Sequence, residues 1–128
     1  MLVGLGTDIV HVPRVEGVLQ RWGLRFLRKV LHPHELGLYS QRQGADARLG
    51  FVAGRWAAKE AAFKALGQAR GSILFPELCI SYTSQGAATL TFEGKAALLA
   101  KRLSVERTHV SLSHERDYAM AVVILEGN

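Results

Sequence analysis

Cysteine is nearly absent from this 128-residue sequence, in which Cys79 is the single residue of its type and no internal disulfide is possible. Such cysteine usage is typical of a reducing compartment, and we expect a cytoplasmic protein. No apolar run approaches the roughly 18 residues that a membrane span needs, and the N-terminus lacks the basic region of a secretory signal. We therefore expect neither a disulfide scaffold nor a membrane protein.

Repeats, low-complexity segments and long linkers are also missing, so we expect residues 1–128 to form a single domain. Hydrophobic residues make up 48% and charged residues 21%, a balance that favours a packed core over a disordered chain. The net charge is +5 at pH 7. A basic surface attracts nucleic acids, nucleotide phosphates and acidic proteins, and the charge alone does not distinguish among them.

The hydrophobic pattern predicts an α+β domain. Residues 2–10 are typical of a strand, one helical pattern runs from Pro13 to Val30, and another runs from Leu49 to Leu66. A short polar helix or loop joins these two helices. We expect a hairpin, a short helix and a closing strand pair at residues 78–83 with 88–92, 94–103, and 108–113 with 118–125. This order predicts a mostly antiparallel sheet that helices cover on one side.

The first strand places small residues and a carboxylate on one face. Because side chains alternate along a strand, Gly4, Gly6 and Asp8 point the same way. Two glycines beside a carboxylate leave room for a bulky anionic group that is held through a cation. On this strand alone, a turn cap or an arginine pair is the more frequent explanation of such an aspartate. Neither a complete dinucleotide fingerprint nor a Gly-Lys-Ser/Thr loop is present.

The second long helix carries charge beside an expected apolar stripe. Lys59 projects into the stripe, Glu60 lies at its edge, and Lys64 follows one turn later. Charges on a buried face are costly unless they are paired or bound to an ion. An ordinary Glu60–Lys64 pair, with the Lys59 amine reaching solvent, explains the pattern equally well. Alternatively, Asp8 and Glu60 supply two carboxylates to Mg²⁺, with both lysines near the phosphates that the metal binds.

Polar side chains also gather in the segment Thr108-His109-Val110-Ser111-Leu112-Ser113-His114-Glu115. Alternation places His109, Ser111 and Ser113 on one face, where they could donate hydrogen bonds to a phosphate. Incidental polar groups at a strand end are the default explanation for such a segment on its own. A zinc site is disfavoured because His109 and His114 fall on opposite faces. No Gly-x-Ser-x-Gly elbow marks either serine as a nucleophile.

Four arginines fall within about 60° of one another on the helix expected after the first strand. They are Arg14, Arg21, Arg25 and Arg28. A solvated basic face is the usual explanation of such a stripe. A stripe of one sign also suits an acidic partner helix or, as the alternative function, the phosphate backbone of a nucleic acid. The chain has no recognisable nucleic-acid signature and few aromatic residues for base stacking, which favours a protein partner.

Together, three segments resemble bacterial holo-[acyl-carrier-protein] synthase, a 4'-phosphopantetheinyl transferase. They are Gly4-Leu5-Gly6-Thr7-Asp8-Ile9-Val10, Arg55-Trp56-Ala57-Ala58-Lys59-Glu60-Ala61 through Lys64-Ala65-Leu66-Gly67, and Ser111-Leu112-Ser113-His114 with Tyr118-Ala119. Each motif is weak alone, but the three occur in the family's order and spacing over essentially the whole chain. The resemblance implies a Mg²⁺-dependent enzyme of fatty acid biosynthesis. Such an enzyme moves phosphopantetheine from coenzyme A to a serine of apo acyl carrier protein and releases 3',5'-ADP.

The resemblance also implies roles for individual residues. Asp8 and Glu60 hold Mg²⁺ against the coenzyme A pyrophosphate, while Lys64 and the Ser-x-Ser-His segment contact coenzyme A. With the second lysine of the long helix, the expected coenzyme A residues are Asp8, Lys59, Lys64, Ser111, Ser113 and His114. Lys64 adds positive charge at the reacting phosphate. The proton of the carrier serine could pass to Glu60, to a metal-bound water, or to His114 acting with Glu115.

Docking of the acidic carrier protein is implied for the basic first helix. The expected contacts are Arg14, Arg21 and Arg25, with the apolar neighbours Val18, Trp22 and Phe26. Family members are homotrimers whose active sites are shared between neighbouring subunits, so we expect the same assembly here. Two positions depart from the family pattern: His11 stands where glutamate is frequent, and His32 stands where threonine often precedes the proline.

Overall fold

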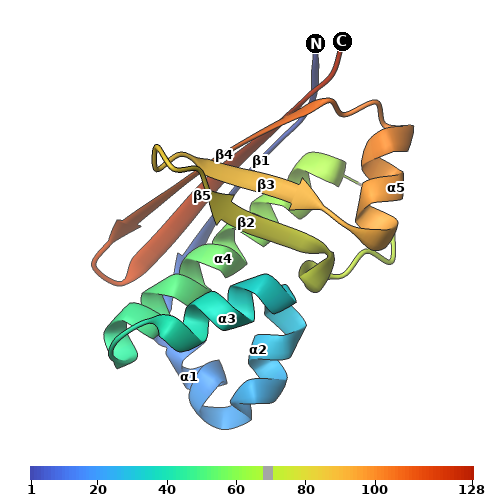
Figure 1. The fold of residues 1–128 in the computed structure, drawn as a ribbon. Helices are drawn as coiled ribbons and strands as arrows, with labels where there is room; N and C mark the ends of the chain where they lie inside the picture. Colours follow the sequence, from blue (N-terminus) through green and yellow to red (C-terminus); the bar gives the residue numbers. More distant parts are fainter. Residues whose placement is uncertain (68–70) are drawn as a thin grey trace.

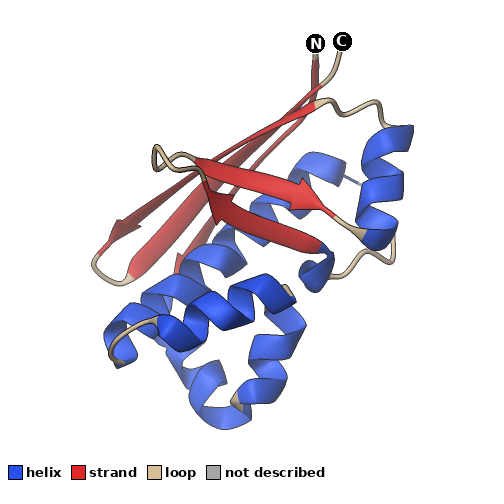
Figure 2. Ribbon diagram, in the orientation of Figure 1, coloured by secondary structure: helices blue, strands red, loops and turns tan. Residues whose placement is uncertain are grey.

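The computed structural model describes residues 1–67 and 71–128. Its elements follow one another in an α+β order, as predicted, and Figure 2 shows them by type. They are β1 (Leu2–His11), α1 (Val12–Trp22), α2 (Leu24–Val30), α3 (Pro33–Gln41), α4 (Ala45–Leu66), the 3-10 helix η2 (Phe75–Glu77), β2 (Leu78–Tyr82), β3 (Ala88–Phe92), α5 (Gly94–Arg102), β4 (Arg107–Glu115) and β5 (Tyr118–Glu126).

The strands form two antiparallel sheets instead of the single sheet that we expected. One sheet has the order β1-β5-β4, and the hairpin β2–β3 pairs separately. Helix α4 lies between the hairpin and the larger sheet (Figure 1). Near β4 the hairpin is held by a side chain, because the Thr108 hydroxyl donates to the Leu90 carbonyl at 2.7 Å. The strand lengths were predictable from the sequence, but the separation of the hairpin was not.

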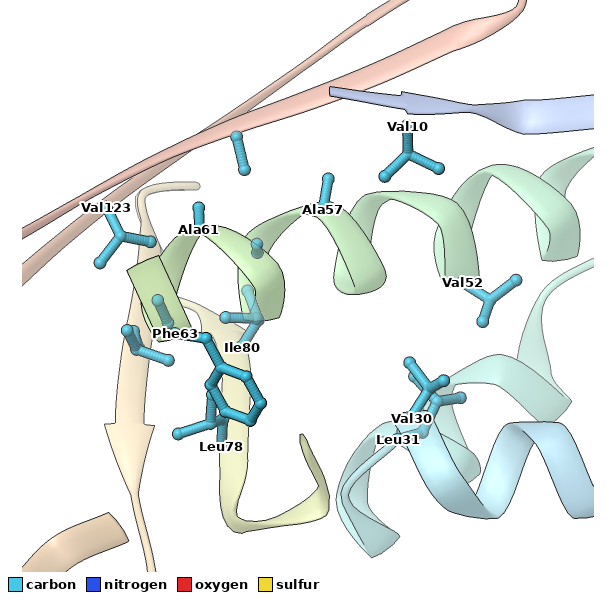
Figure 3. Close-up of a cluster of buried hydrophobic side chains, with 14 of the residues drawn as sticks. Val10, Val30, Leu31, Val52, Ala57, Ala61, Phe63, Leu78, Ile80 and Val123 are labelled. Atoms are coloured by element: carbon cyan, nitrogen blue, oxygen red, sulfur yellow. The ribbon is translucent and has the colours of Figure 1, made fainter. Parts of the chain in front are cut away.

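Helix α4 is buried on nearly all sides, whereas its sequence predicted one apolar stripe. Val10 and Val123 pack on one side of it and Ile80 on the other (Figure 3). Strand β1 crosses this helix closely, since a Cβ added at Gly6 would lie 1.8 Å from the carbonyl oxygen of Ala61. The space that we expected the glycines to leave for a ligand is therefore filled by the backbone of α4.

The helix expected from Pro13 to Val30 is two helices, because the chain turns at Gly23. This residue has a φ of 53°, in the left-handed region that glycine adopts without a steric penalty. The sequence did not reveal the break, since the apolar residues keep helical spacing across it. The four arginines are consequently divided between α1 and α2 and do not form one continuous stripe.

Helix α3 begins with a capping box formed by His32 and Glu35. The Nδ1 atom of His32 accepts a hydrogen bond from the backbone N–H of His34 at 2.9 Å. In return, the Glu35 carboxylate accepts one from the backbone N–H of His32, also at 2.9 Å. The His32 side chain thus accepts a hydrogen bond from a free backbone N–H of the first helical turn, as a threonine side chain does at such a position.

The outer face of the β1-β5-β4 sheet carries large apolar side chains and is not covered by any described helix. Leu5 and Ile9 of β1 are 63% and 66% exposed, and the Met120 opposite Ile9 is also exposed. Helices thus cover this sheet on one side only, as the sequence predicted. None of the described helices is long and apolar enough to cross a membrane.

Candidate functional site

Asp8 of β1 and Lys64 of α4 form the first part of the site. The Lys64 ammonium donates to Asp8 Oδ1 at 3.1 Å and to the carbonyl of Thr7 at 3.0 Å. The Asp8 side chain is only 17% exposed, whereas that of Lys64 is 56% exposed. Lys64 therefore reaches across to β1, and neither the Glu60–Lys64 pair nor an arginine pair of Asp8 is found among the described residues.

Glu60 lies one helical turn before Lys64, on the same side of α4 as the lysine that contacts Asp8. It is half-buried, and its Oε1 accepts a hydrogen bond from the indole N–H of Trp56 at 3.3 Å. Two carboxylates on adjoining elements fit Mg²⁺, which completes its octahedron with phosphate oxygens and water. No group of three or more acidic, histidine or cysteine side chains that could hold a metal occurs in the described residues. The chain itself would therefore supply only part of the metal's coordination shell.

Lys59 lies away from this site, and the structure contradicts the expectation that it contacts a phosphate. Its ammonium is fully buried and donates to Glu35 Oε1 at 2.5 Å and to the carbonyl of Val30 at 2.6 Å. Burial lowers the pKa of Lys59, and the neighbouring Glu35 opposes this shift. The sequence correctly indicated a lysine that needs a partner. It gave no sign that Glu35 is that partner.

His114 of β4 lies against α4 on the inner face of the sheet. Gly54 makes room for it, because a Cβ at Gly54 would lie 3.1 Å from His114 Nε2. No hydrogen bond joins His114 to Glu115 in the described part of the chain, since consecutive side chains of a strand point to opposite faces. The expected His114–Glu115 pair is therefore not formed. His114 instead lines a cavity of about 430 Å³ together with Arg42, Phe51, Arg55 and Tyr82.

Two arginines in this cavity were missed by the sequence analysis. The guanidinium carbons of Arg55 and Arg42 lie 4.0 Å and 5.0 Å from the centre of the same Phe51 ring. Burial lowers the pKa of Arg55, although the nearby Glu35 opposes the shift. Asp46 also lines the cavity, but the two cations outnumber its one carboxylate and favour an anionic occupant. Nothing in the alanine-rich sequence around Arg55 indicated that this residue lines a cavity.

Ser111 and Ser113 lie on the opposite face of the sheet from Asp8. Ser113 is opposite Met120, which is opposite Ile9, so this row belongs to the exposed outer face. Ser111 lies two residues earlier in β4 and therefore on the same face. Asp8 belongs to a row that faces α4. A single chain therefore does not bring the two serines to Asp8 and Lys64.

The expected carrier-docking residues lie mostly together. A groove of about 260 Å³ on α1 and α2 is lined by Val18, Trp22, Arg25, Phe26 and Lys29. The guanidinium carbons of Arg21 and Arg25 lie 5.2 Å and 5.4 Å from the centre of a Trp22 ring. Arg14 lies elsewhere, with its guanidinium 5.8 Å from a ring of Trp56. It is therefore close to the side chain that binds Glu60.

Known proteins match this chain over nearly its full length. The family described as "ACPS: 4'-phosphopantetheinyl transferase superfamily" matches residues 4–123. A Vibrio cholerae protein named holo-[acyl-carrier-protein] synthase is 48% identical over 130 residues, which cover 98% of each chain. The fold is similar to that of the Neisseria meningitidis holo-[acyl-carrier-protein] synthase, with a TM-score of 0.90, 30% identity, and coverage of 98% of this chain and 99% of that one.

A second solved structure is that of a Bacillus anthracis holo-(acyl-carrier-protein) synthase in complex with CoA (3',5'-ADP). It has a TM-score of 0.81 and 30% identity, and the similarity covers 100% of this chain and 99% of that one. The sequence resemblance and the structural similarity thus extend over the same residues. The chain belongs to the 4'-phosphopantetheinyl transferase superfamily.

Proposed function

We propose that this chain transfers the 4'-phosphopantetheine group of coenzyme A to a serine of apo acyl carrier protein, with Mg²⁺ and with release of 3',5'-ADP. The observation that carries the proposal is the Asp8–Lys64 pair beside Glu60, in a chain of this superfamily. The Vibrio cholerae relative is named for this activity, and the similar Bacillus anthracis enzyme was solved in complex with CoA (3',5'-ADP).

Asp8 and Glu60 are the residues that would hold the metal. Mg²⁺ supplies Lewis-acid neutralisation of the pyrophosphate when it is bound. Lys64, which now pairs with Asp8, is exposed enough to turn toward a phosphate oxygen and to offset charge on the leaving group. Glu60 and His114 are the two side chains that we propose as acceptors of the proton of the carrier serine.

The cavity beside His114 suits another anionic part of coenzyme A. Arg42 and Arg55 supply positive charge there, and Phe51 and Tyr82 supply flat apolar walls. Such a combination binds a nucleotide through its phosphates and its ring together. Coenzyme A carries both kinds of group, so its anionic end is the proposed occupant.

A homotrimer is proposed because two parts of the site lie on opposite faces of one sheet. The exposed apolar side chains of Leu5 and Ile9 support a contact between chains on the outer face. Because β1 is an edge strand of its sheet, a neighbouring chain that packs on the outer face and reaches past this edge would bring its Ser111 and Ser113 to the Asp8 site. Each active site would then lie between two chains. The number of three chains is the expectation that the resemblance supplied.

The groove around Trp22 is the proposed docking site for the carrier protein. Arg21 and Arg25 border an apolar floor, which suits an acidic amphipathic helix better than a nucleic acid backbone. The proposed setting is the cytoplasm and fatty acid biosynthesis, with residues 1–128 acting as one domain. Membranes and nucleic acids have no part in this proposal.

Release of 3',5'-ADP tests the proposed function. We expect the wild-type chain to release it from coenzyme A when apo carrier protein and Mg²⁺ are both present. Omission of the carrier, chelation of Mg²⁺, or a carrier whose acceptor serine is replaced by alanine should each stop the release. Release that continues without the carrier would indicate hydrolysis of coenzyme A and would contradict transfer.

A further inference from the structure

Glu35 is a fully buried carboxylate that the proposed reaction does not use. Its Oε1 accepts hydrogen bonds from the Lys59 ammonium at 2.5 Å and from the backbone N–H of His32 at 2.9 Å. Its Oε2 accepts one from the backbone N–H of Ile80 at 2.9 Å. The Nε atom of Arg55 lies 3.6 Å from the same Oε2, close enough for an ion pair. One carboxylate thus joins α3, α4 and β2.

Arg55 completes this arrangement at the wall of the His114 cavity. Its Nη2 donates to the carbonyl of Ile80 at 3.2 Å, so Glu35 and Arg55 together satisfy both backbone polar groups of that residue. The rings of Phe51 and Tyr82 lie 4.0 Å and 5.5 Å from its guanidinium carbon. Apart from its ion pair with Glu35, the buried Nε has no hydrogen-bond partner, and no hydrogen bond of Nη1 is found among residues 1–67 and 71–128. The side chain is held on several sides, and Nη1 stays available.

We propose that Glu35 is a positioning residue, which holds Arg55 and β2 together so that the guanidinium presents Nη1 to an anionic part of coenzyme A. Glu35 itself does not contact coenzyme A. This inference rests on the proposed binding of coenzyme A in the cavity. A long arginine side chain that loses its carboxylate partner gains access to other rotamers, so it no longer matches a fixed anion. Loss of Glu35 should therefore weaken coenzyme A binding more than it slows the transfer step.

Glu35→Gln tests the proposal, because the amide keeps the size of the side chain and an acceptor for Ile80 but lacks the charge. Coenzyme A affinity is measured by titration calorimetry, alongside kcat and the KM of each substrate. We expect the Kd and KM of coenzyme A to rise about tenfold, the usual cost of one lost charge-assisted hydrogen bond. The kcat and the carrier KM should change little. The direction of the change in the Kd of coenzyme A is informative, since removal of a negative charge alone would make the cavity more positive and would lower this Kd.

Thr108→Val is the matched control, since its hydroxyl holds the same hairpin through Leu90 without contacting Arg55. It should lower stability and leave the Kd of coenzyme A unchanged. A second variant, Glu35→Met with Lys59→Met, avoids an unpaired buried ammonium and should raise the Kd as Glu35→Gln does.

An unchanged or lower Kd in both Glu35 variants, or an equal rise in Thr108→Val, would overturn the positioning role. If the wild-type chain binds coenzyme A but transfers nothing, the proposed function is contradicted. The positioning role is then decided by the Kd comparison alone. A wild-type chain that does not bind coenzyme A contradicts both proposals.

Discussion

At the scale of single residues, the tightest steric constraint lies where β1 crosses α4. A Cβ at Gly6 would meet the carbonyl oxygen of Ala61 at 1.8 Å, and no rotamer change moves a backbone atom out of the way. Gly17 differs, because an added Cβ there, in the middle of α1, has nothing within 4 Å. Substitution by alanine is therefore expected to have opposite effects on stability at the two glycines.

Gly6→Ala should lower the free energy of unfolding by about 3 kcal/mol or more, because strand and helix must separate to admit the methyl group. Gly17→Ala should raise it by about 0.5–1 kcal/mol, since alanine is the better residue in a helix interior. Urea denaturation of both variants measures the difference. Equal stability of the two would contradict the close crossing of β1 and α4.

Charged residues on apolar elements could be recognised from the sequence, but their partners could not. Lys59 stood out because an amine on a buried face needs a counter-charge, and Lys64 stood out as a partner of Glu60 or of a phosphate. In the structure Lys59 pairs with Glu35 and Lys64 with Asp8, and both pairs depend on how distant segments pack on α4. Arg55 was missed because its surroundings come from three separate elements.

Lys64→Ala should raise the KM of coenzyme A, because one positive charge beside the proposed phosphate site is lost. The rise should be about fivefold to tenfold, as for a charge-assisted contact at a partly exposed position. The carrier KM should stay nearly unchanged. Steady-state kinetics with each substrate varied in turn measure both values. The reverse pattern would remove Lys64 from the phosphate site.

At the scale of secondary-structure elements, helices α1 and α2 are separated by a break and form a groove with basic borders and an apolar floor. The break at Gly23 lets Arg21 at the end of α1 and Arg25 at the start of α2 both approach Trp22. The sequence analysis placed these arginines and their apolar neighbours on one continuous helix and missed the break. The spacing of apolar residues does not reveal a single glycine in the left-handed conformation when helical spacing continues beyond it.

Reversal of Arg25 to Glu should raise the carrier KM about tenfold at low salt and much less at high salt, because screening weakens exposed charge pairs. The KM of coenzyme A should hardly change. Arg102→Glu makes the same charge change on α5, away from the groove, and is the control (Figure 1). A carrier KM that is equally insensitive to both reversals at low salt would place docking elsewhere.

At the scale of the whole molecule, the main exposed apolar surface is the outer face of the β1-β5-β4 sheet, which no described helix covers. Sequence alternation predicted which side chains share each face, including the opposite placement of His109 and His114. It could not predict that the hairpin pairs separately, since strand partners are chosen by long-range packing. The exposed Leu5 and Ile9 are explained if another copy of the chain covers them.

Ile9→Glu should break up the proposed trimer and abolish transfer while preserving the fold of each chain. A charge on an apolar contact surface must lose its water when two chains meet, and that cost opposes assembly. Leu98→Glu is the control, because Leu98 is similarly exposed, at 71%, but lies on α5. Light scattering gives the mass of each variant. A trimeric, active Ile9→Glu protein would rule out this face as the interface.

Intact-mass spectrometry of the carrier protein tests whether Asp8 and Glu60 support phosphopantetheine transfer. Apo acyl carrier protein, coenzyme A and Mg²⁺ are incubated with the wild-type chain, with Asp8→Ala, or with Glu60→Ala, and circular dichroism confirms that each variant is folded. The carrier should gain the mass of one phosphopantetheine group with the wild-type chain and stay unmodified with either variant. An unmodified carrier with the wild type, or modification at the wild-type rate by both variants, would contradict the proposed function and its metal site.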